Sequence, residues 1–156
     1  MAIKIAVAAN FIGEYSDWTL KSLEMENLLY LSQMMFLGRY NEPLVKGAFC
    51  ATIYGPRNFG LYSKIKHYSP RQIKSLFQDL KFPEIKDVRM IESMEEIMKH
   101  FGHVGLPKLV HLTQAPGGAW DRNFEIGKSN VIPREHIIEE YTLRKTGAFL
   151  TYSRKS

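Results

Sequence analysis

The spacing of apolar residues along the chain predicts a fold built mainly from helices. Apolar side chains recur at helical spacing over residues 3–15 and form a wide face over 19–37, after which Gly38 is placed to end the helix. Over residues 44–54 the spacing suits extended chain instead, and a Gly-Pro pair closes that stretch. The pattern therefore predicts a compact, mainly α (α+β) fold with one small β element near residues 44–54.

Proline, glycine and capping residues mark the helices of the second half of the chain. A short apolar helix is expected over residues 61–67, and a loop or weak edge strand over 82–91. The helix that covers residues 94–101 should end at Gly102. The remaining helix starts are predicted at Ser69 with Pro70, at Ser93 with its capping-box partner Glu96, at Pro107 and at Pro133.

Length and composition point to one domain without disulfides. A chain of 156 residues has the common size of a single compact domain, so we take residues 1–156 as one domain with 142–156 as a possible extended tail. Cys50 is the only cysteine, which excludes an intrachain disulfide and fits a reducing cytosol. The start of the chain lacks a secretory signal, and no apolar run approaches the roughly 20 residues that span a bilayer. We expect a cytoplasmic protein with no membrane partner.

The residues that could bind a metal or act as a nucleophile are poorly placed for either role. His100, His103 and His111 could meet in space, but no cysteine or acidic pair lies near them in sequence to complete a metal site. Cys50 lies between two apolar residues and is expected to be a small buried side chain.

Carboxylates and glycine-rich segments give no further sign of catalysis. Glu139 and Glu140 are adjacent on a predicted helix and diverge by about 100 degrees, so we expect a solvated face and not a catalytic pair. The segments 54–60 and 115–118 lack both the phosphate-loop and the dinucleotide-binding patterns. The sequence therefore predicts no catalytic residues, no metal and no cofactor, and a protein that is not an enzyme.

A basic stretch runs over residues 61–89, with seven basic against three acidic residues. The net charge of the whole chain is +5, which permits an anionic partner without requiring one. No DNA- or RNA-binding signature accompanies the stretch, and a solvated helix face is the favoured interpretation. A possible anion-binding site, for phosphates or for an acidic protein, consists of Lys64, Lys66, Arg71 and Lys74.

The loop over residues 115–121 places Trp120 and Asp121 among glycines and a proline. Tryptophan is usually buried at least in part, and it is also enriched at binding hot spots. Two interpretations stay open: an aromatic plug that anchors the loop, or an anchor for a partner.

Six motifs, in order along the chain, resemble those of the Panacea domain, also called the SocA-like family. Each motif is weak alone, but together and in register they are specific. The departures from the family pattern are Thr52, Arg57 and Gln114, which stand where the family has tryptophan, valine and histidine. The motifs that carry the resemblance are residues 25–33 (Met-Glu-Asn-Leu-Leu-Tyr-Leu-Ser-Gln), Tyr54-Gly55-Pro56 with 61–68, Phe101-Gly102-His103, Leu112-Thr113, Trp120-Asp121 and residues 132–141.

The resemblance implies an antitoxin-like protein that binds and neutralises a cognate protein toxin, or delivers it to a cytosolic protease, in a bacterial or prophage toxin–antitoxin system. Specificity would come from a variable surface on a shared scaffold. The alternative is a basic nucleic-acid-binding regulator or a prophage accessory protein. The expected partner contacts, besides the basic tail, are Thr52, Tyr54, Gly55, Pro56, Arg57, Tyr62, Trp120 and Asp121.

Overall fold

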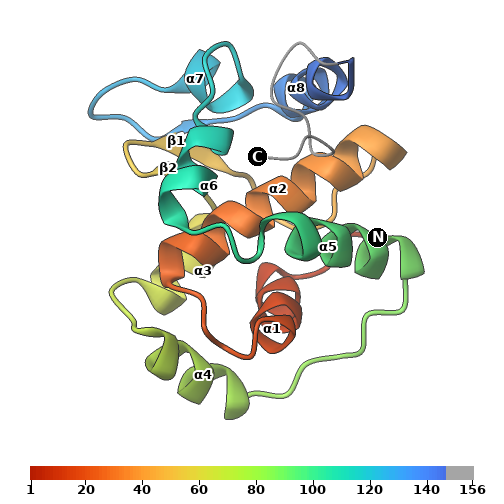
Figure 1. The fold of residues 1–156 in the computed structure, drawn as a ribbon, viewed down its shortest axis with the longest axis vertical. Helices are drawn as coiled ribbons and strands as arrows, with labels where there is room; N and C mark the ends of the chain where they lie inside the picture. The colour runs from red at the N-terminus through yellow and green to blue at the C-terminus, as the bar shows by residue number, and fades with distance from the viewer. Residues whose placement is uncertain (147–156) are drawn as a thin grey trace.

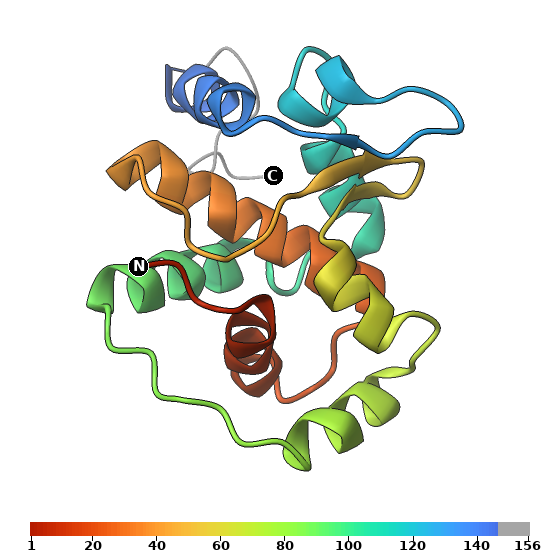
Figure 2. The same ribbon diagram turned by 180° about the vertical axis from the view of Figure 1, so that it is seen from behind.

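A computed structural model describes residues 1–146 of the chain, and its helices surround one central helix, α2 (Ser22–Tyr40). Residues 25–37 of α2 are all buried, because helices pack against it from several directions. Figures 1 and 2 show α1 and α4 on one side of α2, and α7, α8 and the sheet on the other. The other helices are α1 (Ile5–Tyr15), α3 (Phe59–Ile65), α4 (Pro70–Gln78), α5 (Val88–Phe101), α6 (Leu106–Thr113), α7 (Ala119–Asn123) and α8 (Arg134–Thr146).

The predicted β element is confirmed, but the Gly55-Pro56 pair expected to close it as a turn lies in a second strand, so the element is a hairpin, which a third strand extends. Strand β1 (Cys50–Thr52) pairs antiparallel with β2 (Gly55–Arg57), and on its other edge with β3 (Asn130–Val131). Ala51 lies opposite Pro56 on one side and Asn130 on the other. The sequence pattern did not indicate β3, because two residues are too few to show an alternation.

Several predicted helix boundaries are confirmed by the backbone. Ser69 caps α4 through its hydroxyl, which accepts a hydrogen bond from the Gln72 N–H at 3.2 Å, and Pro70 is the first helical residue. Gly102 follows the last residue of α5. Pro107 lies in the first turn of α6, and Pro133 immediately precedes α8.

The predicted start of α5 is too late in the chain, because the N-cap is Asp87 and not Ser93. Asp87 caps this helix by accepting a hydrogen bond from the Arg89 N–H at 2.9 Å, so α5 begins at Val88. The loop predicted over 82–91 therefore ends at residue 87. Ser93 lies inside the helix and is buried, while Glu96 pairs with Arg39 on α2 at 2.9 Å. The Asp87 carboxylate also accepts hydrogen bonds from the Arg89 side chain, which hold it in place at the start of the helix.

The predicted end of α2 is also wrong, because Gly38 lies within the helix. The helix continues to Tyr40, and Asn41 ends it in the left-handed conformation with φ of 54°. At Gly38 a side chain would overlap with the ring of Tyr141 from α8. The glycine is therefore explained by close packing of α8 on α2. The predicted tail from residue 142 begins inside α8, and residues 147–156 lie outside the described residues.

Candidate partner-binding surface

The β1–β2 hairpin presents two large apolar side chains at its tip. Ile53 is 67% exposed and Tyr54 is 58% exposed. The Thr52 hydroxyl accepts a hydrogen bond from the Tyr54 N–H at 3.2 Å and donates one to the Gly55 carbonyl at 2.9 Å. Gly55 has φ of 112°, which side chains rarely tolerate. The tip is thus held in one conformation while its apolar side chains face solvent.

Trp120 fixes this hairpin from the inside. Its Nε1 donates a hydrogen bond to the Thr52 carbonyl at 2.8 Å, and its ring stacks on Phe124 with 4.5 Å between centroids. The indole is buried. The Asp121 carboxylate accepts a hydrogen bond from the Gly117 N–H at 2.9 Å and so closes the preceding loop. Of the two interpretations that stayed open for Trp120, the arrangement matches the aromatic plug.

A buried ion pair lies beneath the hairpin. Arg57 donates to both carboxylate oxygens of Glu26 on α2, with Nε to Oε1 at 2.8 Å and Nη2 to Oε2 at 3.3 Å. The Glu26 side chain is only 1% exposed. Burial raises the pKa of Glu26 above its usual value, and the attraction and hydrogen bonding of Arg57 oppose that rise. The pair ties β2 to the central helix.

Two tyrosines cover the outer side of the Arg57 guanidinium. Its carbon lies 4.0 Å from the ring centroid of Tyr62 and 5.1 Å from that of Tyr54, both within the range of a cation–π interaction. Tyr62 in turn meets Phe59 edge-on at 5.9 Å. We call Tyr54, Arg57, Tyr62 and Phe59 the aromatic strip. It runs from the hairpin tip to the start of α3.

The structure therefore brings the expected contact residues together, but at different depths. Tyr54 is exposed and Tyr62 is partly exposed, whereas Thr52, Gly55, Pro56 and Arg57 are buried beneath them. The sequence interpretation missed Glu26 and also Asn27, whose Oδ1 accepts a hydrogen bond from the Thr113 hydroxyl at 2.7 Å. Polar residues within an otherwise apolar stretch of α2 were the available signal, because a buried polar group needs a partner.

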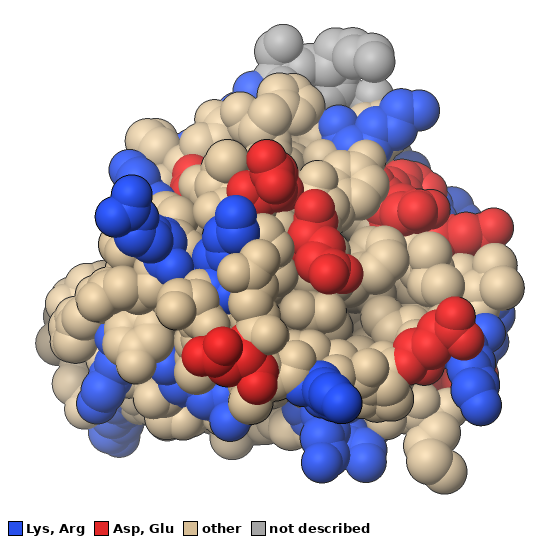
Figure 3. Space-filling model, turned by 90° about the horizontal axis from the view of Figure 1, so that it is seen from below, with Lys and Arg blue, Asp and Glu red and all other residues tan. Residues whose placement is uncertain are grey.

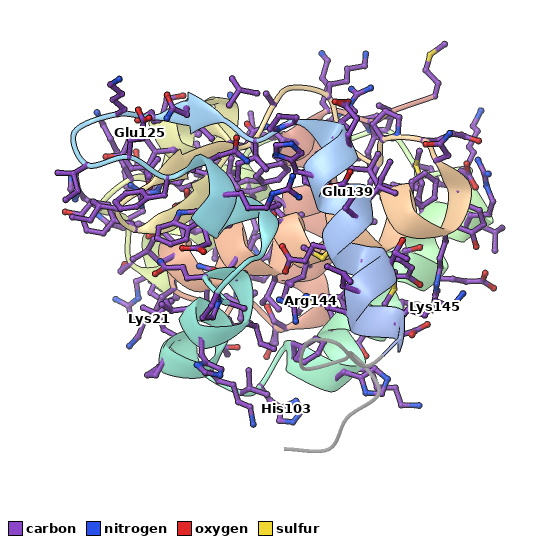
Figure 4. The ribbon with its side chains drawn as sticks, turned by 90° about the horizontal axis from the view of Figure 1, so that it is seen from above. Lys21, His103, Glu125, Glu139, Arg144 and Lys145 are labelled. Carbon is purple, nitrogen blue, oxygen red and sulfur yellow. The ribbon has the colours of Figure 1, made fainter. Side chains whose placement is uncertain are left out.

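A second buried ion pair corrects the expectation for Glu140. Glu139 is exposed as predicted and pairs with Arg122, but Glu140 is 2% exposed and binds Arg144 at 2.6 Å. Its Oε1 also accepts a hydrogen bond from the Ala119 N–H at 2.6 Å. Figure 4 shows Arg144 between α8 and the helices next to it, where it also donates to the Leu112 carbonyl. This pair joins α8 to α6 and α7.

The basic residues singled out in the sequence all lie on the surface. Lys64 is on α3, Lys66 directly follows that helix, and Arg71 and Lys74 are on α4. Within residues 1–146 none of them lies within 4.0 Å of a carboxylate. Figure 3 shows basic side chains gathered on the left of the face seen from below, the side on which α3 and α4 lie in Figure 1, with acidic ones between them. We call the four residues the basic patch.

Cys50 lies opposite Arg57 in the hairpin, whereas the three histidines lie outside it. Cys50 is buried, and burial raises the pKa of its thiol. His103 and His111 are exposed, on the turn after α5 and on α6, and His100 is partly exposed. In the described part of the chain no three His, Cys, Asp or Glu side chains cluster closely enough to hold a metal ion. None of its helices is both long and apolar enough to cross a membrane.

Comparison with known proteins agrees with the resemblance read from the sequence. The model of the family described as "Antitoxin SocA-like, Panacea domain" matches residues 27–121, more than half of the chain. The chain belongs to this family. The SocA-like region includes the hairpin, the aromatic strip and Trp120, and it ends before α8. The chain is 28% identical to Antitoxin SocA of Caulobacter vibrioides (strain NA1000 / CB15N) over 115 residues, which cover 67% of this chain and 60% of that protein. No solved structure matches the chain.

Proposed function

We propose that this SocA-like chain is a non-enzymatic, antitoxin-like protein that binds a cognate protein toxin and blocks it by covering its active surface. The observation that carries the proposal is the exposed aromatic and apolar surface at the hairpin tip, held rigid by buried polar contacts. Tyrosine and arginine are enriched at protein interfaces. Family membership supports the antitoxin-like role, since the matched relative is named as an antitoxin.

Rigidity is the reason why this surface suits tight binding. The Thr52 side chain, the Trp120 indole and the Arg57–Glu26 pair fix the hairpin before any partner arrives. Binding then costs less conformational entropy, since the hairpin that presents the contact side chains is already ordered. Exposed Ile53 and Tyr54 would act as the apolar anchors of the interface.

The proposed contacts fall into two groups. Tyr54, Tyr62 and the neighbouring Ile53 would touch the toxin. Thr52, Gly55, Pro56, Arg57, Trp120 and Asp121 would support those contacts from within or beside the hairpin. Thr52, Arg57 and Gln114 depart from the family pattern, and they shape the region beneath Tyr54; the cognate toxin would therefore differ from those of other members.

Co-expression with the product of the adjacent gene tests the proposal. We expect a stable complex on co-purification and rescue of growth from the toxicity of that product. The Ile53→Ser/Tyr54→Ala double variant should bind at least about 30-fold more weakly, the effect of removing one hot spot of about 2 kcal/mol. Tyr15→Ala is the matched control, because Tyr15 is 48% exposed at the far end of α1.

Two results would contradict the proposal. The first is the absence of a complex with any neighbouring gene product. The second is equal binding by the hairpin variant and the Tyr15→Ala control. The half-life of the toxin during co-expression separates occlusion from delivery to a cytosolic protease: a toxin that persists supports occlusion, and one that disappears only when the antitoxin is present supports delivery.

A nucleic-acid-binding regulator is the second candidate, and the unpaired basic patch favours it. Phosphate contacts give an affinity that falls steeply with salt. A gel-shift assay with the protein's own promoter fragment at 50 and 200 mM salt would show this dependence, and Arg71→Ala/Lys74→Ala should abolish the shift. No shift at low salt would exclude this role.

A further inference from the structure

A cavity of about 530 Å³ opens at the far end of the aromatic strip. It lies where the N-terminal end of α1, the segment 46–48 and the start of α3 meet. Figure 2 shows this side of the molecule, with the chain after α2 running across α2, above α1, to the sheet. Three lysines, Lys4, Lys46 and Lys64, belong to the lining, and no acidic residue does. We call it the lysine cavity.

Apart from Asn58, the rest of the lining is small or apolar. Phe59 stands at the cavity with 43% of its surface exposed, although a phenyl ring gains by burial. Gly47 and Gly60 keep the cavity open, because a side chain at either position would meet the Asn58 amide at 3.0 Å. Gly47 also has φ of 90°, which favours glycine. The cavity can therefore accept a large apolar side chain beside Phe59.

The electrostatics of the lysine cavity favour an anion. In residues 1–146 no carboxylate lies within 4.0 Å of the three lysines. The N-terminal end of α1 adds to their positive potential, since Lys4 provides no side-chain cap and no acidic residue stands in the first turn. Three like charges around one apolar cavity repel each other, and a ligand with carboxylates would relieve that repulsion.

We propose that the lysine cavity docks an acidic segment of the partner protein, in which one large apolar side chain is flanked by aspartate or glutamate. This rests on the proposed function, because it assigns to the toxin a second point of contact. The apolar side chain fills the cavity against Phe59, and the flanking carboxylates pair with Lys4, Lys46 and Lys64. A nucleotide fits less well, since Asn58 is the only uncharged polar side chain in the lining.

The position of the cavity supports a shared interface. Phe59 belongs both to the lysine cavity and to the aromatic strip, where it contacts Tyr62 at 5.9 Å. A partner bound at Tyr54 can therefore reach the cavity along one continuous surface. Aromatic anchors near the centre of an interface and charged contacts around them are the usual arrangement of protein–protein complexes.

An NMR titration with a defined peptide tests the chemistry of the cavity without the toxin. The probe is acetyl-Asp-Glu-Phe-Asp-Glu-amide, and its neutral analogue acetyl-Asn-Gln-Phe-Asn-Gln-amide is the control. We expect the acidic peptide to shift the amide signals of Ile5, Gly47 and Gly60, and the neutral peptide to bind at least about tenfold more weakly. Lys46→Glu should weaken the acidic peptide about fivefold, as expected when one exposed ion pair is replaced by repulsion.

The control variant is Lys99→Glu, which makes the same charge change at an exposed lysine on α5, outside both the cavity and the basic patch. It should leave peptide binding unchanged. Equal loss in Lys46→Glu and Lys99→Glu, equal binding of the two peptides, or shifts elsewhere on the surface would each overturn the proposal. Tighter binding of ATP than of the peptide at the same signals would overturn it too, in favour of a nucleotide site.

A double variant of the cavity, tested against the toxin itself, separates this proposal from the proposed function. If Lys4→Glu/Lys46→Glu, which leaves the aromatic strip intact, weakens the toxin complex at least about tenfold, as the reversal of two charge contacts predicts, the second contact is supported. If the complex depends on Tyr54 but is insensitive to this double variant, the cavity proposal is wrong and the toxin-binding proposal stands. If the peptide binds as expected but no toxin does, the toxin-binding proposal fails, and with it the assignment of the cavity to a toxin segment.

Discussion

Breaking the buried pair between Glu26 and Arg57 should destabilise the protein more than any surface change of charge. Arg57→Met keeps a long side chain but leaves the Glu26 carboxylate without its cation at a site where it is 1% exposed. Removing one partner of a buried pair costs about 3–5 kcal/mol, and the lost contact with Tyr62 at 4.0 Å adds about 0.5–1 kcal/mol. For a chain of this size the Tm should fall by roughly 7–24 °C.

An exposed ion pair provides the matched control for this prediction. Arg122 binds Glu139 at 2.7 Å, but the two side chains are 40% and 57% exposed. Arg122→Met makes the same substitution at a similar distance and should cost less than about 1 kcal/mol, because water screens the pair. The double variant Glu26→Leu/Arg57→Met removes both buried charges and should recover most of the stability lost in Arg57→Met.

The stability lost in Arg57→Met should also depend on pH, and the buried Glu26 carboxylate determines the direction of that dependence. Burial raises the pKa of Glu26 in the folded protein, and Arg57 opposes the rise. When the pKa is higher in the folded protein than in the unfolded one, the group's contribution to stability is fully present below the unfolded pKa of about 4.3. That contribution is lost as the pH rises through the pKa of the folded protein. Without Arg57 the folded pKa rises further, so the variant should lose less stability at pH 5 than at pH 7.5.

Urea unfolding followed by circular dichroism, at both pH values, measures these differences. A change in midpoint with an unchanged slope reports stability alone. The reasoning is refuted if Arg57→Met costs no more than Arg122→Met at pH 7.5. It is also refuted if the double variant is no more stable than Arg57→Met, since the cost would then come from lost packing and not from an unpaired charge.

Two further predictions concern packing and acid stability. Gly38→Ala should destabilise by about 1–3 kcal/mol through overlap with the Tyr141 ring, although alanine favours a helix; a gain in urea midpoint would contradict the packing explanation. Hydrogen bonds from Arg89 hold the pKa values of Glu42 and Asp87 below their usual range. The stability that these two carboxylates contribute is therefore present above a pH of about 4 and is lost as the pH falls through the lowered pKa values. Arg89→Met should therefore show a shallower loss of stability between pH 5 and 3 than the native chain, and an equal loss would argue against this role.

The sequence by itself determined the fold class, the family, and those helix starts that strong local signals mark. These features depend on neighbours close in the chain. Ser69 caps α4 through contacts within its own turn, and the apolar stretch over residues 25–37 predicts burial whichever segment packs on it. The extended piece that forms β1 could be predicted for the same reason, because its alternating apolar residues are local. The second strand could not, because Gly55 and Pro56 are typical of a turn and form β2 only by pairing with β1.

Only the tertiary structure decided which polar residues are buried and what they bind. Arg57 and Glu26 are 31 positions apart in the chain, and Glu140 lies beside an exposed glutamate that the sequence does not distinguish from it. A charge can be buried only where a distant segment supplies its counter-charge, and the spacing of residues along the chain does not contain that information. The same limit applies to Gly38: its neighbours in the sequence predict a helix end, but the glycine is there because α8 packs closely on α2. It also applies to the lysine cavity, whose three lysines come from separate segments and meet only when α1 and α3 pack together.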